Sequence, residues 1–221
     1  DDKTAINTQI AIDSVRPIYS IDTDLSNAAI NGITDMFLTV IEARTDEELV
    51  ITEDTIVEEE SEPEVQVVEN SKIQQIAKIT ESVLFSTIST STIEVLVEIS
   101  NYDLNNKTNY ISQIELETKT QADQILSSGI SNESLNQLRQ TLVSSPPYLD
   151  LSSELYVLIP ENRIRSVVAE IIAENLLANE KLEKELWEEQ KTKIAESVDP
   201  VIVKYFEGDL VISEGERISA V

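Results

Sequence analysis

The sequence predicts an α+β domain that is mostly helical, with a small sheet formed by N- and C-terminal strands. Apolar residues recur at helical spacing through most of residues 72–197. Pro17 and Pro200 each stand between a helix-like and a strand-like segment. Each proline is expected to end the preceding helix, because the residue before a proline avoids helical backbone angles. Short runs rich in β-branched residues lie near both ends of the chain, at residues 18–21, 201–206 and 210–213.

The N-terminal segment is expected to form two helices with a strand between them. The first helix covers residues 4–15 and leads into the strand at 18–21. Asp22 or Asp24 is suited to accept backbone N–H groups at the start of the second helix, over 25–43. The apolar residues at helical spacing are Ile6, Ile10 and Val15 in the first helix, and Ile33, Met36, Phe37, Val40 and Ile41 in the second.

An acidic loop or insertion is expected at residues 45–71, which hold eleven acids and no base. Like charges at this density repel one another, and Pro63 interrupts regular structure. Short strands at 49–51 and 65–68 could flank the acidic tip. A calcium site is the alternative, but no loop here has the alternating aspartate spacing that ends in a glutamate.

Residues 72–197 are expected to form a helical body. Gly129 stands at a helix C-terminus, and Ser131 or Asn132 can cap the helix that follows. The apolar stretch 155–159 is either a short strand or a helix end. The last helix is expected to have Leu182, Leu186 and Ile194 on its inner side. Trp187 is expected to pack beside them, and a ligand platform is its alternative role. The predicted helices cover residues 72–88, 92–100, 104–128, 132–143, 162–174 and 180–197.

The C-terminal segment, residues 198–221, is expected to form a hairpin with a tight turn at Gly208. Residues 13–18 (DSVRPI) and 196–201 (ESVDPV) resemble each other, and each leads from a helix end into a strand. We therefore expect the two ends of the chain to share one sheet, with residues 18–21 near 201–206.

Composition excludes most kinds of catalytic site. The 221 residues include no His and no Cys, so a histidine metal site, a thiolate site and a serine–histidine triad are all impossible. The net charge of −26 argues against nucleic acid as a partner, because phosphate binding needs clustered Lys and Arg. No apolar run approaches the roughly 20 residues of a membrane span, and the opening residues DDKTAINTQ do not read as a signal peptide.

Carboxylate chemistry stays open on composition alone. Asp22-x-Asp24-x-Ser26 loosely matches the nucleophile loop of haloacid-dehalogenase-type phosphatases, but Ser213 stands where the final Asp after Gly208-Asp209 should be. A strand end with an Asp helix cap is the favoured interpretation. Paired carboxylates for glycoside hydrolysis are uninformative in a chain with 42 acids.

Both ends of the sequence carry motifs of a known family. The opening motif consists of Ala11, Val15, Pro17, Tyr19, Asp22 and Phe37. The closing motif is more specific and reads Val198-x-Pro200-Val201 and Gly208-Asp209-x-Val211-Ile212-x-x-Gly215-Glu216-x-Ile218. With these residues the chain resembles the extracellular domain of bacterial seven-transmembrane HD receptors of the PgpH type. Between the two motifs, Ser128-Gly129-Ile130 and Asn175-Leu176 are similar to family landmarks. The chain departs from the family in the acidic 45–71 segment and in Glu174, where a proline is expected.

The resemblance implies that residues 1–221 form a single extracytoplasmic domain at the bacterial cell membrane. Its expected function is sensing or signal transmission within a membrane-bound HD phosphohydrolase resembling cyclic di-AMP phosphodiesterases. Its expected partners are an extracellular ligand or protein and the transmembrane helices of the full-length protein. The chain itself is expected not to be an enzyme and to need no cofactor or metal. A scaffold domain without a small ligand, and a carboxylate-based secreted hydrolase, are the alternatives.

Overall fold

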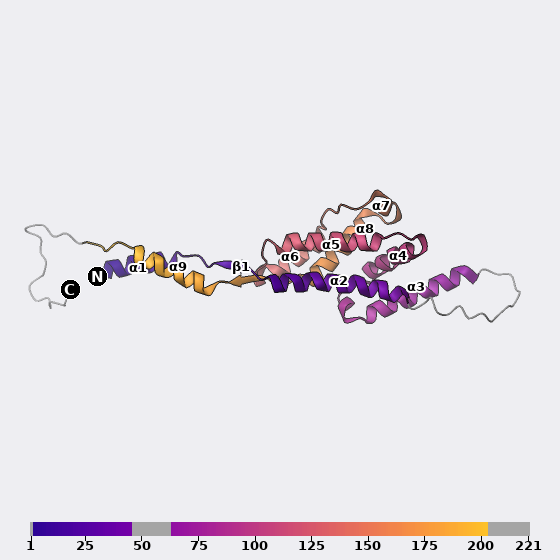
Figure 1. Cartoon of the computed structure of the whole chain (residues 1–221), viewed down its shortest axis with the longest axis horizontal. Coiled ribbons are helices and arrows are strands. Elements are labelled where there is room, and N and C mark those ends of the chain that lie inside the picture. The colour runs from indigo at the N-terminus through magenta and orange to yellow at the C-terminus, as the bar shows by residue number, and fades with distance from the viewer. Residues whose placement is uncertain (1, 46–62, 203–221) are drawn as a thin grey trace, which may run out of the picture. The chain divides into compact units, whose positions relative to one another are not determined.

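The computed structural model describes residues 2–45 and 63–202, which form two compact units (Figure 1). Of the described residues, the central unit contains 21–45 and 63–180, and the terminal unit contains 2–20 and 181–202. The described residues are mostly helical, with one two-stranded antiparallel sheet, as the sequence predicts. The strands are β1 (Tyr19–Ile21) and β2 (Glu180–Leu182), and the boundary between the units falls inside both.

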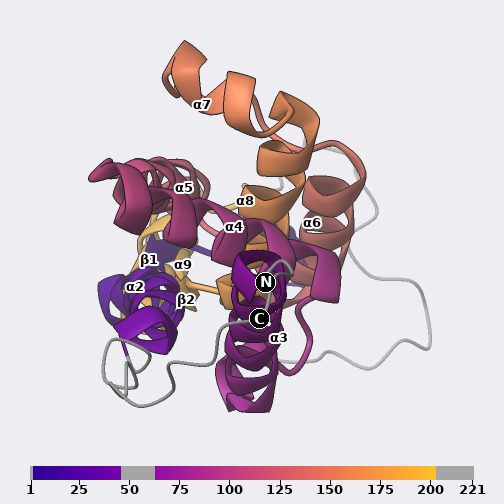
Figure 2. The same cartoon turned by 90° about the vertical axis from the view of Figure 1, so that its right-hand side faces the viewer.

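Helix α8 is the core helix of the central unit. It contacts α2, α4, α5 and α6, and Figure 2 shows it between α5 and α6. It is buried because apolar residues line the face that it turns toward these helices: Ile164, Val167, Val168, Ile171 and Ile172 are each at most 2% exposed. The helices of this unit are α2 (Thr23–Thr45), α3 (Pro63–Glu81), α4 (Thr90–Asn106), α5 (Tyr110–Leu126), α6 (Asn132–Ser144), α7 (Ser153–Leu158) and α8 (Glu161–Asn175), with a 3-10 turn η1 (Val83–Phe85).

Polar side chains begin these helices where the sequence predicts caps. The Asp22 carboxylate accepts the backbone N–H groups of Asp24 and Leu25 at the start of α2. The Ser131 hydroxyl accepts the N–H of Ser134 at the start of α6. Gly129, after the end of α5, has a φ of 77°, which glycine adopts without a Cβ penalty. The predicted caps at Asp22 and Ser131 are therefore confirmed.

The side chain of Asn179 joins three segments of the central unit. It is fully buried, and its amide oxygen accepts the N–H of Ile130 at 2.7 Å. Its amide nitrogen donates to the Ser26 hydroxyl and to the Leu126 carbonyl, both at 2.8 Å. The main chain of Asn179 adds a bond to the Ile130 carbonyl and accepts one from Asp22 N–H. The start of α2, the end of α5 and the start of β2 are thus fixed to one residue.

The terminal unit pairs α1 (Asp2–Asp13) with α9 (Lys184–Ser197). Two paired helices shield only the side that each turns toward the other. In α9 even this side is only partly covered, since the helix contains no buried residue. The expectation that Leu186 lies on an inner face is wrong, because its side chain is 51% exposed. Ile6 and Ile10 are also mostly exposed.

Several predicted elements differ from the structure. Residues 180–182 form β2 and pair with β1, so the predicted last helix starts only at Lys184. Residues 63–71 belong to α3, so the expected strand at 65–68 is wrong and the acidic loop is shorter than predicted. The 155–159 stretch is mainly helical, as α7, and its Leu155 is fully buried. The break predicted near residue 102 lies instead at 107–109.

Two predictions fall partly or wholly outside the described residues. Val201 and Ile202 are not in a strand, and the remainder of the C-terminal hairpin, from residue 203 onward, lies outside the described part of the chain. Among the described residues β1 pairs with β2 and residues 201 and 202 do not pair with it, whereas residues 203–206 of the expected partner strand lie outside the described part of the chain. The acidic tip, residues 46–62, also lies outside the described residues.

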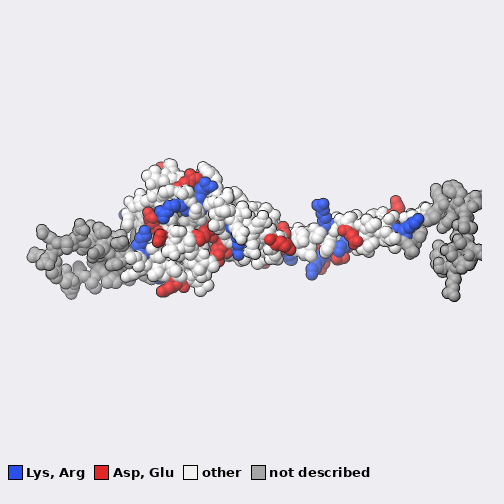
Figure 3. All heavy atoms as spheres, turned by 180° about the vertical axis from the view of Figure 1, so that it is seen from behind, with Lys and Arg blue, Asp and Glu red and all other residues white. Residues whose placement is uncertain are grey.

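Charged side chains of both signs are interspersed on the face of the central unit drawn in Figure 3. Such a mixture is typical of a solvated protein surface. In the described part of the chain, α5, α8 and α9 each have an ion pair between residues four apart, such as Lys119 with Glu115 at 2.8 Å on α5. Pairs of this kind stabilise single helices by a few tenths of a kcal/mol.

Replacing Asn179 with Ala is expected to lower the free energy of unfolding by about 3 kcal/mol, because it leaves buried donors and acceptors unpaired. Asn136→Ala, an exposed position on α6, is the matched control and should change the free energy by less than about 0.5 kcal/mol. Urea unfolding followed by circular dichroism measures both. Equal stability of the two variants would contradict the structural importance of Asn179.

Lys107→Gly is expected to stabilise the central unit by about 1 kcal/mol. Lys107 ends α4 with φ 54° and ψ 39°, a left-handed conformation that costs a residue with a Cβ more than it costs glycine. Lys107→Ala keeps the Cβ and should leave stability nearly unchanged. Thermal unfolding of the three proteins is the measurement, and a lower melting temperature for the glycine variant would contradict the prediction.

Candidate functional site

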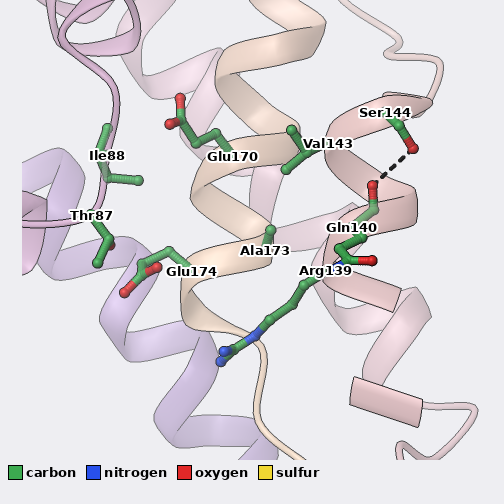
Figure 4. Close-up of a pocket in the computed structure, with 9 residues that line it drawn as sticks. All are labelled: Thr87, Ile88, Arg139, Gln140, Val143, Ser144, Glu170, Ala173 and Glu174. Carbon is green, nitrogen blue, oxygen red and sulfur yellow. Dashed lines mark hydrogen bonds between the residues drawn. The ribbon is translucent and has the colours of Figure 1, made fainter. Parts of the chain in front are cut away.

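A pocket of about 450 Å³ lies in the central unit between α6, α8 and the segment that joins η1 to α4 (Figure 4). This volume is within the range of small-molecule sites in proteins. Residues from all three segments line the pocket: Thr87, Ile88, Arg139, Gln140, Val143, Ser144, Glu170, Ala173 and Glu174.

The helical spacing of the lining residues explains why they converge. Glu170, Ala173 and Glu174 are three and four residues apart and so share one face of α8. The opposite side of α8 carries the buried residues that hold it in the core. On α6, Leu142 is buried, whereas Val143 remains 55% exposed and faces the pocket (Figure 4). The amphipathic character of both helices therefore leaves one mixed face of each toward the pocket.

Glu170 is bound to the N-terminus of α4 by its carboxylate. One oxygen accepts the backbone N–H of Ser89 at 2.7 Å. The other accepts the Ser89 hydroxyl at 2.8 Å and the Thr92 hydroxyl. The partial positive charge of a helix N-terminus favours a carboxylate there. Glu170 is therefore already paired within the protein and contributes mainly to the pocket wall.

Arg139 extends from α6 to the C-terminal end of α8 (Figure 4). Its Nη2 donates to the carbonyl oxygen of Leu176 at 2.6 Å, whereas its buried Nε has no hydrogen-bond partner. The last turn of α8 has no basic residue of its own. A cation at this end is favourable because helix C-terminal carbonyls carry partial negative charge.

Glu174 lies in the same last turn of α8 and is exposed. Among the ion pairs of the described residues, none joins it to Arg139. The pocket thus presents a carboxylate and a guanidinium at one end that are not paired with each other. The exposed side chain of Val143 supplies apolar surface to the lining, to which the buried Ile88 and Ala173 add only their edges.

A second, smaller pocket of about 250 Å³ lies where the first turns of α4 and α8 meet. Ser91, Asn162, Arg163 and Ser166 give it a polar lining. The Ser91 hydroxyl is already hydrogen-bonded to that of Ser89. Its small size makes it the weaker candidate for ligand binding.

The described residues of the phosphatase-like motif have structural roles. Asp22 caps α2, and the Ser26 hydroxyl donates to the Asp22 carbonyl and accepts from Asn179. Gly208 and Asp209 lie outside the described residues. In the described ranges, the acidic residues form no group of three or more that could hold a metal ion. The strand-end and helix-cap interpretation of this motif is confirmed for Asp22.

Trp187 has a packing role in the terminal unit. Its Nε1 donates to the carbonyl of Val15 at 3.1 Å, and the Lys191 ammonium lies 3.5 Å from its ring centroid. Hydrogen bonding of the indole N–H is usual for a partly buried tryptophan.

Sequence reasoning named no ligand-binding residue, and of the pocket lining it singled out only Glu174, as a departure from a family pattern. The available signal was the spacing of Glu170, Ala173 and Glu174, which places them on one face of a helix whose other face is apolar. That spacing does not reveal which other segment faces α8. The contribution of Arg139 from α6 therefore needed the tertiary structure.

Glu170→Gln is expected to lower the free energy of unfolding by about 2 kcal/mol, because the charged acceptor of three hydrogen bonds is lost. Glu174→Gln, one turn along the same helix, is the matched control and should change it by less than about 0.5 kcal/mol. Chemical unfolding of both variants is the measurement. A Glu174 variant as unstable as the Glu170 variant would contradict this division of roles.

No helix in the described part of the chain is both long and apolar enough to cross a membrane.

No curated protein and no solved structure matches the chain. A family model described as 7TM-HD extracellular matches residues 1–221, the whole length of the sequence. The chain therefore belongs to the 7TM-HD extracellular family (7TMR-HDED), the extracellular domains of seven-transmembrane HD proteins.

Proposed function

We propose that this domain is the sensor or signal-transmitting domain of a membrane-bound HD phosphohydrolase that acts on cyclic di-AMP, on the extracytoplasmic face of the bacterial cell membrane. Membership of the 7TM-HD extracellular family supports the location. The chain contains no His, so the HD metal site of such an enzyme would have to be supplied by another part of the protein. The pairing of α1 with α9 is the structural observation on which the proposal chiefly rests.

Three hydrogen bonds join the segments that contain α1 and α9 and show their relative direction. The hydroxyl of Thr4 accepts the N–H of Val201 at 2.9 Å. Further along the chain, the Val15 carbonyl accepts from Trp187, and the Ile18 carbonyl accepts the Glu183 N–H at 2.9 Å. The partner number falls as the residue number rises. The two segments are therefore antiparallel, and Thr4 and Val201 are neighbours.

Antiparallel pairing suits a domain placed between two membrane helices. Segments that continue from Thr4 and from Val201 would begin side by side, as they must if each leads to a helix of one bundle. A ligand or protein that favours one arrangement of α1 against α9 would bias the arrangement of the attached helices. The expected partners are accordingly the transmembrane helices of the full-length protein and an extracellular ligand or protein.

A scaffold or protein-binding domain is the second candidate function. Ile6, Ile10 and Leu186 of the terminal unit are each more than half exposed. Exposed apolar side chains of this size favour contact with another protein surface. In that case the domain would hold the membrane protein in an assembly and would not change its activity.

Cysteines at Thr4 and Val201 in the full-length protein test the signalling proposal. The pair is expected to form a disulfide under mild oxidation, and the crosslink should change cyclic di-AMP hydrolysis in membranes at least threefold. Reduction should restore the original rate. Thr4→Cys with Thr192→Cys is the matched control, since nine residues separate Thr192 from Val201, and it should not crosslink.

The possible outcomes separate the two candidates. A fully formed crosslink with an unchanged rate would favour the scaffold function over signal transmission. Absence of the crosslink would contradict the antiparallel pairing itself. Absence of cyclic di-AMP hydrolysis in the uncrosslinked full-length protein would contradict the proposed substrate.

A further inference from the structure

We propose that the pocket between α6 and α8 binds a free amino acid with an apolar side chain. This inference rests on the proposed sensor function, for which it names the ligand class. It is carried by the unpaired opposite charges of Arg139 and Glu174 beside an apolar surface, all within the central unit.

The charged end of the pocket suits a zwitterion. Arg139 makes one hydrogen bond, to the neutral carbonyl of Leu176, so its guanidinium charge has no carboxylate partner in the described part of the chain. Glu174 is exposed and forms no ion pair with it. A ligand carboxylate can accept from Arg139 while its ammonium group donates to Glu174, which gives two charge-assisted hydrogen bonds.

Ligands with a single charge suit the same end less well. A simple anion would pair with Arg139 but would lie near the Glu174 carboxylate. A simple cation would pair with Glu174 but would lie near the guanidinium. Glu170 keeps its negative charge, but its carboxylate already accepts hydrogen bonds from Ser89 and Thr92. Arg139 and Glu174 are therefore the charged groups of the lining that a ligand can pair with, and a zwitterion pairs with both.

The remainder of the lining suits an apolar side chain. Val143, on α6 in Figure 4, is the exposed apolar residue of the lining, whereas Ile88 and Ala173 are buried and contribute only their edges. Val143 is 55% exposed, although it is apolar, because it borders the open pocket. Covering this surface with a ligand side chain gains about 25 cal/mol for each Å² of apolar surface removed from water. A leucine- or phenylalanine-sized group fits a pocket of about 450 Å³, whereas glycine would leave this surface wet.

Calorimetric titration of the 221-residue chain tests the proposal with defined probes. L-Leucine and L-phenylalanine are expected to bind. Glycine, which lacks the apolar group, should bind at least tenfold more weakly. N-Acetyl-leucine lacks the ammonium charge and leucinamide lacks the carboxylate, so each should also lose at least tenfold.

Single substitutions then locate the site. Arg139→Gln and Glu174→Gln should each weaken leucine binding at least tenfold, and Glu133→Gln, an exposed α6 position outside the pocket, should not. Because Arg139 also holds the end of α8, Val143→Trp provides a test that keeps this contact. It should block binding by filling the pocket mouth while leaving the melting temperature within a few degrees.

The proposal is overturned if no probe binds the wild-type chain, or if leucinamide or N-acetyl-leucine binds as tightly as leucine. Binding that survives Val143→Trp and Glu174→Gln would also overturn it, since the amino acid would then bind elsewhere. These readouts do not depend on phosphohydrolase activity. A negative titration beside a crosslink-sensitive full-length enzyme would therefore reject this ligand and leave the signalling proposal intact.

Discussion

The central unit depends on the buried amide of Asn179. Three chain segments form hydrogen bonds to this one side chain in place of the hydrogen bonds that they would otherwise make to water. The Ile130 N–H, the Leu126 carbonyl and the Ser26 hydroxyl all bond to it. An unpaired polar group in the interior is costly, so these segments are stable together only in this arrangement. The start of α2 and the end of α5 are thereby fixed beside the point where the chain leaves the central unit.

Helix α8 links this junction to the pocket. Its buried side packs on α2, α4, α5 and α6, and its last turn is held by Arg139 at Leu176. Asn175, in that turn, lies against Gly32, where any added Cβ would stand 2.3 Å from the Asn175 amide oxygen. The glycine therefore permits close packing of α2 on α8. A ligand at Arg139 and Glu174 would act on the turn that meets α2, a route by which binding can alter helix packing.

The family landmarks Ser128-Gly129-Ile130 and Asn175-Leu176 acquire physical roles in this structure. Gly129 supplies the left-handed turn after α5, and Ile130 then presents its N–H to Asn179. Asn175 donates to the Met36 sulfur, and Leu176 accepts from Arg139. The first landmark thus forms part of the hydrogen-bonded contacts around Asn179, and the second forms the contacts at the C-terminal end of α8. Glu174, the departure from the family pattern, adds a carboxylate to the pocket.

The sequence by itself determined most helices, the Asp22 and Ser131 caps, the left-handed turn at Gly129 and the family, because these follow from local periodicity, capping chemistry and short motifs. Tertiary structure decided the partner of β1, since three-residue strands carry too little pattern to specify pairing. It also decided the helical form of residues 63–71 and the placement of Arg139 and Glu174 in one pocket. Arg139 and Glu174 lie far apart in the chain, and local spacing does not show which helix faces α8.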